Sequence, residues 1–171
     1  MAHVTRLIAL AALFAASSAV AQNRHNSAAP IDFGADHIEL QDKANRAILS
    51  GNVSVRQAEM TLNAARMTVA YTGQVVDGSP QVSRLDAAGG VVVTSPSETA
   101  RGALGIYDLD RKLITLVGNV VLEREGSQIS GQRLVIDLDS GRAVIDGGPA
   151  GVGQSGGRVT GHFTVPQRSG S

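Results

Sequence analysis

The sequence lacks cysteine and tryptophan, and aromatic residues make up only 3% of its 171 positions. Without cysteine no disulfide can form, so burial and strand pairing alone have to stabilise the fold. With so few rings, the core has to be built from valine, isoleucine, leucine and alanine. A wide aliphatic interior would explain this composition, and so would an alanine-rich genome.

Excess charge is also lacking, because 15 lysines and arginines balance 15 aspartates and glutamates. A nucleic-acid partner would require a strongly basic face, so the charge balance argues against one. The sequence has no apolar run long enough to cross a membrane. Its apolar stretch at residues 7–16 is about half of the roughly 20 residues that a spanning helix needs.

The first 21 residues have the three parts of a secretory signal peptide. Arg6 supplies the positive charge, residues 7–16 form the apolar stretch, and Ala19-Val20-Ala21 supplies the small residues before Gln22. The alternative, a membrane anchor, is disfavoured by the short apolar stretch. We therefore expect export followed by cleavage.

What the sequence does contain is a repeated pattern centred on glycine. Gly-Asn-Val occurs at 51–53 and at 118–120, with apolar residues two and four positions before and after each glycine. The same frame fits Gly89 and, more loosely, Gly147, so the four glycines are 38, 29 and 29 residues apart. A repeat of this size predicts a stack of strands and excludes most enzyme folds.

The expected fold class is all-β, a single domain built from repeated strand units. Apolar residues alternate along the chain and turn residues recur every eight to twelve positions, as is typical of such folds. Each central glycine lets its strand bend. The expected segments are a signal peptide at 1–21, a flexible leader at 22–29, the β domain at 30–146, a glycine-rich linker at 147–157, a possible last strand at 158–165 and a tail at 166–171.

If the repeats stack, their apolar side chains form one continuous face, because side chains alternate along a strand. This face could be the closed core of a small β sandwich or a slot for an apolar ligand, and the pattern alone does not decide between them. The residues expected on it are Val53, Val55, Met67, Val69, Val91, Val93, Ile106, Leu116, Val120, Leu122, Leu134 and Ile136.

Catalytic and metal-binding patterns are weak. A G-x-G-x-x-G pattern at 151–156 overlaps a G-x-S-x-G pattern at 153–157, but only 14 residues follow and none predicts the helix that both motifs need. A hydrolase would depend on Ser155 alone. The histidines are isolated and have no metal-ligand spacing. We therefore expect no enzyme activity, cofactor or metal.

An ordered series of segments resembles the OstA-like family. The resemblance extends from residue 30 to about residue 165, and its most specific part is the series rather than any single motif. The matching segments are Pro-Ile-Asp-Phe at 30–33 and the stretches at 49–55, 98–102, 107–122 and 130–137.

The resemblance implies an antiparallel β-jellyroll, bent and slightly twisted, in the periplasm. It also implies that acyl chains of lipid A, the lipid part of lipopolysaccharide, lie within the fold, with Ile31 and Phe33 of the first strand lining the slot. The implied partners are an LptC-like inner-membrane protein, an LptD-like outer-membrane protein and further copies of the chain, joined head to tail.

A lipid in such a slot would keep its headgroup outside, because burying unpaired sugar phosphates is too costly. Solvated surface charge is the favoured role of four basic residues that are also candidate contacts at the rim: Arg66, Arg101, Lys112 and Arg133. The sequence thus favours a lipopolysaccharide carrier that forms part of a bridge between two membranes. The alternative is a structural β-repeat subunit with a closed core and no lipid.

Overall fold

The computed structural model describes residues 25–72, 81–148 and 157–164. The expected signal peptide, most of the glycine-rich linker and the tail lie outside these ranges. The strands are β1 Ile31–Gly34, β2 His37–Gln41, β3 Arg46–Gln57, β4 Met60–Thr72, β5 Gln81–Thr94, β6 Glu98–Asp108, β7 Leu113–Arg124, β8 Ser127–Asp137, β9 Arg142–Asp146 and β10 Thr160–His162. A short 3₁₀ turn, Asp42–Ala44, joins β2 to β3, and no helix within the described ranges is long and apolar enough to cross a membrane.

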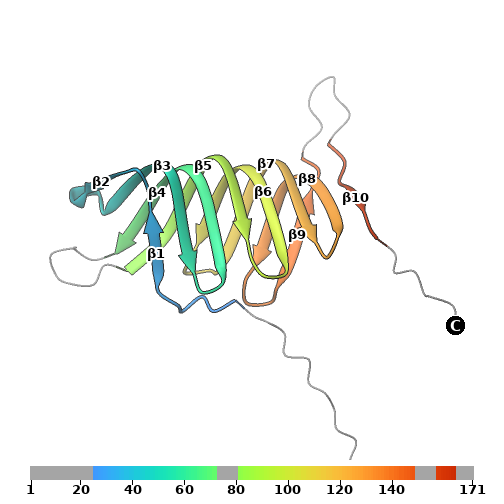
Figure 1. Ribbon diagram of the computed structural model, residues 1–171, viewed down its shortest axis with the longest axis horizontal. Helices are drawn as coiled ribbons and strands as arrows, with labels where there is room; N and C mark the ends of the chain where they lie inside the picture. The colour runs from blue at the N-terminus through green and yellow to red at the C-terminus, as the bar shows by residue number, and fades with distance from the viewer. Residues whose placement is uncertain (1–24, 73–80, 149–156, 165–171) are drawn as a thin grey trace, which may run out of the picture.

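All the strands belong to one antiparallel sheet, which confirms the all-β prediction. Strands β3 to β8 follow one another as hairpins, so each pairs with its neighbours in sequence. At the two ends the sheet is completed by short strands, because β1 and β2 both pair with β3, while β9 and β10 both pair with β8. Figure 1 shows the strands side by side along the long axis, with β2 near one end and β10 at the other.

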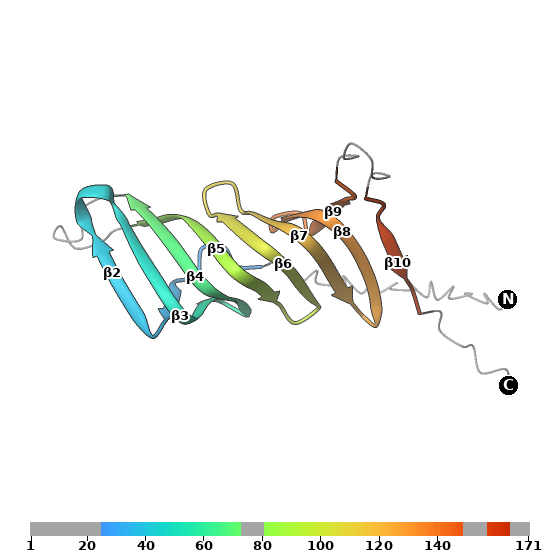
Figure 2. The same ribbon diagram turned by 90° about the horizontal axis from the view of Figure 1, so that it is seen from above.

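Each long strand is bent near its middle, so the sheet folds into two walls joined along the line of bends. One wall, which we call the β2–β9 wall, contains β2, the first halves of β3, β5 and β7, the second halves of β4, β6 and β8, and β9. The other, the β1–β10 wall, contains β1, the remaining halves and β10. The view from above shows β2 to β8 in sequence order along the long axis, with β10 at the end (Figure 2).

The bends lie at three of the four glycines that the repeat identified. The fourth, Gly147, follows the end of β9, and its φ is not positive. Gly51, Gly89 and Gly118 have φ angles of 75°, 86° and 85°, and the next residue in each strand also has a positive φ. That next residue is Asn52, Gly90 or Asn119. Because asparagine tolerates the left-handed region better than most residues, Gly-Asn and Gly-Gly form the same bend. The pairing register shifts at each of these points.

The line of bends is tightly packed, because Gly89 and Gly118 lie against the previous strand and Gly51 lies against Asp36, between β1 and β2. A Cβ added to Gly89 would lie 2.7 Å from Ala65 Cβ, and one added to Gly118 would lie 3.0 Å from Ala103 Cβ. The even-numbered strands therefore bend at small residues as well. The repeat did not mark these second bends.

Candidate functional site

The inner faces of the two walls enclose a narrow interior of aliphatic side chains. Most residues predicted for the apolar face are buried there, because the alternation continues in phase on both sides of every bend. They are Val53, Val55, Met67, Val69, Val91, Val93, Leu116, Val120, Leu122, Leu134 and Ile136. Ile31 is half-buried and packs against this cluster.

One predicted lining residue, Ile106, lies on the other face, so that prediction is wrong. Its neighbours Gly105 and Tyr107 are buried, whereas Ile106 is only half-buried. The register shift at the bend of β6 pairs Tyr107 with the buried Ile114 and leaves Ile106 opposite Thr115. In a run of two apolar residues only one can face inward, and here it is the tyrosine.

The sequence reasoning missed several residues of the inner face, among them Met60 and Leu62 at the start of β4. Both are buried. The alternation of Met60, Leu62 and Ala64 was a usable signal, but these residues precede the bend of an even-numbered strand, where no glycine marks the repeat. The buried Gln57 at the end of β3 carried no signal at all.

The interior is closed in the middle and open at its β1 and β2 end. Leu49, Met67 and Leu116 have no exposed surface. Phe33, by contrast, is 50% exposed although its partner across the strands, Val55, faces inward. Ile38 and Leu40 are also exposed, at 42% and 59%, opposite the inward-facing Leu49 and Ala47. These apolar side chains face inward but have no further strand to cover them.

The opposite end is open in the same way. A cavity of about 680 Å³ lies between β8, β9 and the segment around β10. Phe163, on this cavity, is 63% exposed. The apolar lining of this cavity is Leu122, Ile129, Ala143, Ile145, Val159 and Phe163. The aliphatic interior therefore reaches the surface at both ends of the molecule.

A third opening lies along the mouth, the side where the free edges of the two walls face each other. A cavity of about 540 Å³ there is bordered by residues of both walls. Its apolar lining is Met60, Val93, Ala100, Ile114, Ile136 and Leu138. Volumes of this size are within the range of ligand pockets.

One hydrogen bond crosses the interior near the mouth. Tyr107 Oη, on the β2–β9 wall, donates to Gln57 Oε1, on the β1–β10 wall, at 2.6 Å. Burial raises the pKa of the Tyr107 phenol above its usual value. The phenol therefore remains protonated at neutral pH and can donate this bond.

The predicted headgroup rim is not assembled as expected. Arg66, Arg101 and Arg133 are exposed on the outer faces beside the bends, away from the mouth. The alternation that puts Met67, Ala100 and Leu134 inside turns these arginines outward. Arg101 pairs with Glu123 at 2.8 Å and Arg133 with Asp146 at 3.4 Å. Lys112 does lie in a turn at the free edge of its wall, where it pairs with Asp139 at 2.8 Å.

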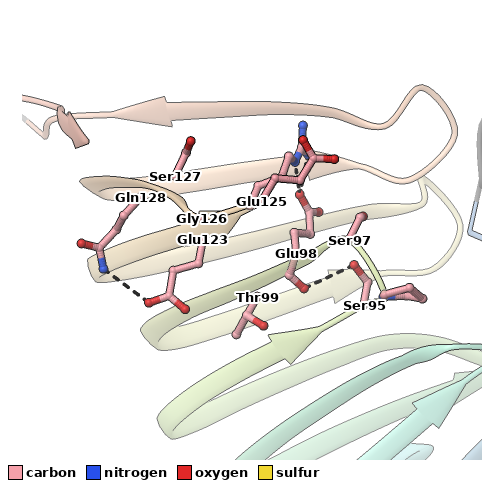
Figure 3. A pocket seen from close by; sticks show the side chains of 11 residues that line it. Ser95, Ser97, Glu98, Thr99, Glu123, Glu125, Gly126, Ser127 and Gln128 are labelled. Carbon is pink, nitrogen blue, oxygen red and sulfur yellow. Dashed lines mark hydrogen bonds and ion pairs between the residues drawn. The ribbon is translucent and has the colours of Figure 1, made fainter. Parts of the chain in front are cut away.

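A polar pocket of about 420 Å³ lies between the β5–β6 and β7–β8 turns. Figure 3 shows its serine and glutamate side chains on these turns and on the strands beside them. Glu98 pairs with Arg124, and Gln128 Nε2 donates to Glu123 at 3.4 Å. Among the described residues that line this pocket, none is histidine or cysteine. No cluster of metal-ligating side chains occurs elsewhere in the described ranges.

The described architecture is that of a bent β-jellyroll with an aliphatic interior open at both ends. The structure is similar to the crystal structure of LptH, the LptA-homologous periplasmic component of the lipopolysaccharide transport device of Pseudomonas aeruginosa. The TM-score is 0.69 at 19% identity, over 82% of this chain and 99% of that chain. This likeness confirms the jellyroll fold.

Sequence comparison supplies the family. The model of the LptA/(LptD N-terminal domain) lipopolysaccharide transport proteins matches residues 33–142. An uncharacterised protein of Rhizobium meliloti (strain 1021) is 35% identical over 145 residues, which cover 82% of this chain and 78% of that protein. The chain therefore belongs to the LptA/(LptD N-terminal domain) family of lipopolysaccharide transport proteins, as the OstA-like resemblance indicated.

Proposed function

We propose that this chain is a periplasmic carrier that holds the acyl chains of lipopolysaccharide between its walls while the sugar headgroup stays in water. The observation that carries this proposal is that inward-facing apolar side chains are exposed at both ends of the interior. In a closed sandwich these positions would be covered. Phe33, Leu40 and Phe163 instead have more than a third of their surface in solvent.

The energetics suit this role. Each buried methylene contributes roughly 0.8 kcal/mol. About a dozen methylenes, fully covered, would therefore contribute about 10 kcal/mol. The sugar phosphates would remain at the mouth, because no buried cation is available among the described residues to pair with them.

We further propose that copies of the chain join head to tail and extend the slot from one copy to the next. At one end β1 and β2, and at the other β9 and β10, are the outermost strands. Each has one row of backbone groups without a strand partner within the described sheet, and such edges accept an added strand. A contact between two different ends can repeat from one copy to the next, so it can build a bridge. An LptC-like and an LptD-like protein would occupy the two ends of that bridge.

Lipid co-purification tests the carrier role. The chain, purified from the periplasm without detergent, should carry lipopolysaccharide that mass spectrometry detects at roughly one molecule per bridge unit or less. The rival function is a closed structural subunit, which the complete burial of Leu49, Met67 and Leu116 would also suit. Protein free of lipid that also fails to take up added lipopolysaccharide would favour this rival.

A further inference from the structure

The described residues contain one buried polar side chain, Gln57, and its surroundings point to a feature of the mouth. Gln57 is 2% exposed and lies at the end of β3. Its amide is fully hydrogen-bonded. Gln57 Oε1 accepts from Tyr107 Oη at 2.6 Å and lies 3.1 Å from His25 Nε2. Gln57 Nε2 donates to the carbonyl oxygens of Ser27 and Ala29 at 2.9 and 3.1 Å.

Three of these bonds reach the segment before β1. Residues 25–29, which the sequence suggested as part of a flexible leader, therefore lie against the end of β3. We call this segment the strap. In Figure 1 the chain before β1 runs along the side where the hairpin turns lie, which is the mouth.

The strap also borders the mouth cavity. His25 and Asn26 line it together with Ser140 and Gly141, which come from the β8–β9 turn of the opposite wall. The strap thus extends from Gln57 on one wall towards the free edge of the other. The cavity behind it has the apolar lining described above, including Ile114 and Ile136.

We propose that the strap closes the mouth and that Gln57 is the latch that holds it, so that a lipid must displace the strap to enter from the side. This inference rests on the proposed carrier function. The latch consists of hydrogen bonds, which water can replace when the strap leaves, so opening costs much less than separating the aliphatic walls. Acyl chains that enter then cover the surface that the strap leaves.

The absence of cysteine allows a direct test. Asn26→Cys and Ser140→Cys introduce a pair of thiols across the mouth, which a cleavable bifunctional thiol reagent can join in the full mature chain. The probe is fluorescently labelled lipopolysaccharide. We expect the cross-linked protein to take up the probe at least tenfold more slowly than the same protein after cleavage of the linker.

Gln57→Leu tests the latch itself. Without its amide, the amides of residues 25–29 should exchange with deuterium at least tenfold faster, and lipopolysaccharide uptake should become several-fold faster. Gln128→Leu, at an exposed glutamine on the outer face, is the matched control and should change neither rate. Equal uptake by cross-linked and cleaved protein would overturn the strap but leave the carrier function standing. No uptake by any variant would overturn both.

Discussion

Gly89→Val should lower the free energy of unfolding by about 2–5 kcal/mol, because it combines backbone strain with a clash. Gly89 has a φ of 86°, a region that β-branched residues almost never occupy. Its new Cβ would lie 2.7 Å from Ala65 Cβ, which is closer than real Cβ atoms approach. Neither strand can move away without opening the line of bends. Urea unfolding followed by circular dichroism measures the change.

Gly34→Val is the matched control, since Gly34 also lies in a strand and has nothing within 4 Å of its added Cβ. Its φ is not positive. We expect its stability to change by no more than about 0.5 kcal/mol. If both variants unfolded at the same urea concentration as the unchanged protein, the account of the bends would be wrong.

Phe33→Asp should weaken lipopolysaccharide binding by about 10- to 100-fold. Covering a phenylalanine with hydrocarbon contributes roughly 1.5–3 kcal/mol, and an aspartate at the same place would have to be desolvated against the acyl chains. Because Phe33 is 50% exposed in an edge strand, the substitution should leave the fold intact. In cells, the variant should fail to replace the unchanged protein in lipopolysaccharide delivery to the surface.

Leu104→Asp provides the comparison. Leu104 is 52% exposed, almost the same as Phe33, but it lies on the outer face of the β2–β9 wall. Lipopolysaccharide binding by this variant should match that of the unchanged protein. Equal losses in the two variants would mean that general apolar surface, rather than the inner face, holds the lipid.

The sequence allowed the repeated unit to be predicted because its physics is local. A bend that requires two residues with positive φ leaves a glycine in the chain, and inward alternation on both sides of it follows from strand geometry. The positions of Gly51 and Gly118 therefore predicted where the strands bend. The alternation around Gly118 predicted that Leu116 and Val120 belong to the core. At Gly89-Gly90 the sequence departs from Gly-Asn, yet both residues have a positive φ, as in the other two bends.

Other features depend on contacts that no local pattern records. The face of Ile106 was set by the register shift in β6, which depends on its pairing with β7. The outward direction of Arg66, Arg101 and Arg133 follows from the alternation of side chains along their strands. The location of the mouth, which lies away from these arginines, cannot be derived from that alternation. Gln57 and the strap are joined across 28 to 32 residues of sequence. The exposure of Phe33 and Phe163 follows from where the sheet ends, which the repeat does not specify.

The most direct test of the slot is photo-cross-linking in living cells. A photoreactive amino acid placed at Phe33 or Phe163 should form a covalent adduct with lipopolysaccharide, because both side chains lie on the inner face where the interior opens. The same amino acid at Leu104, which is equally exposed on the outer face, should form none. Adducts from Leu104 as abundant as those from Phe33, or none from either end of the slot, would contradict the account.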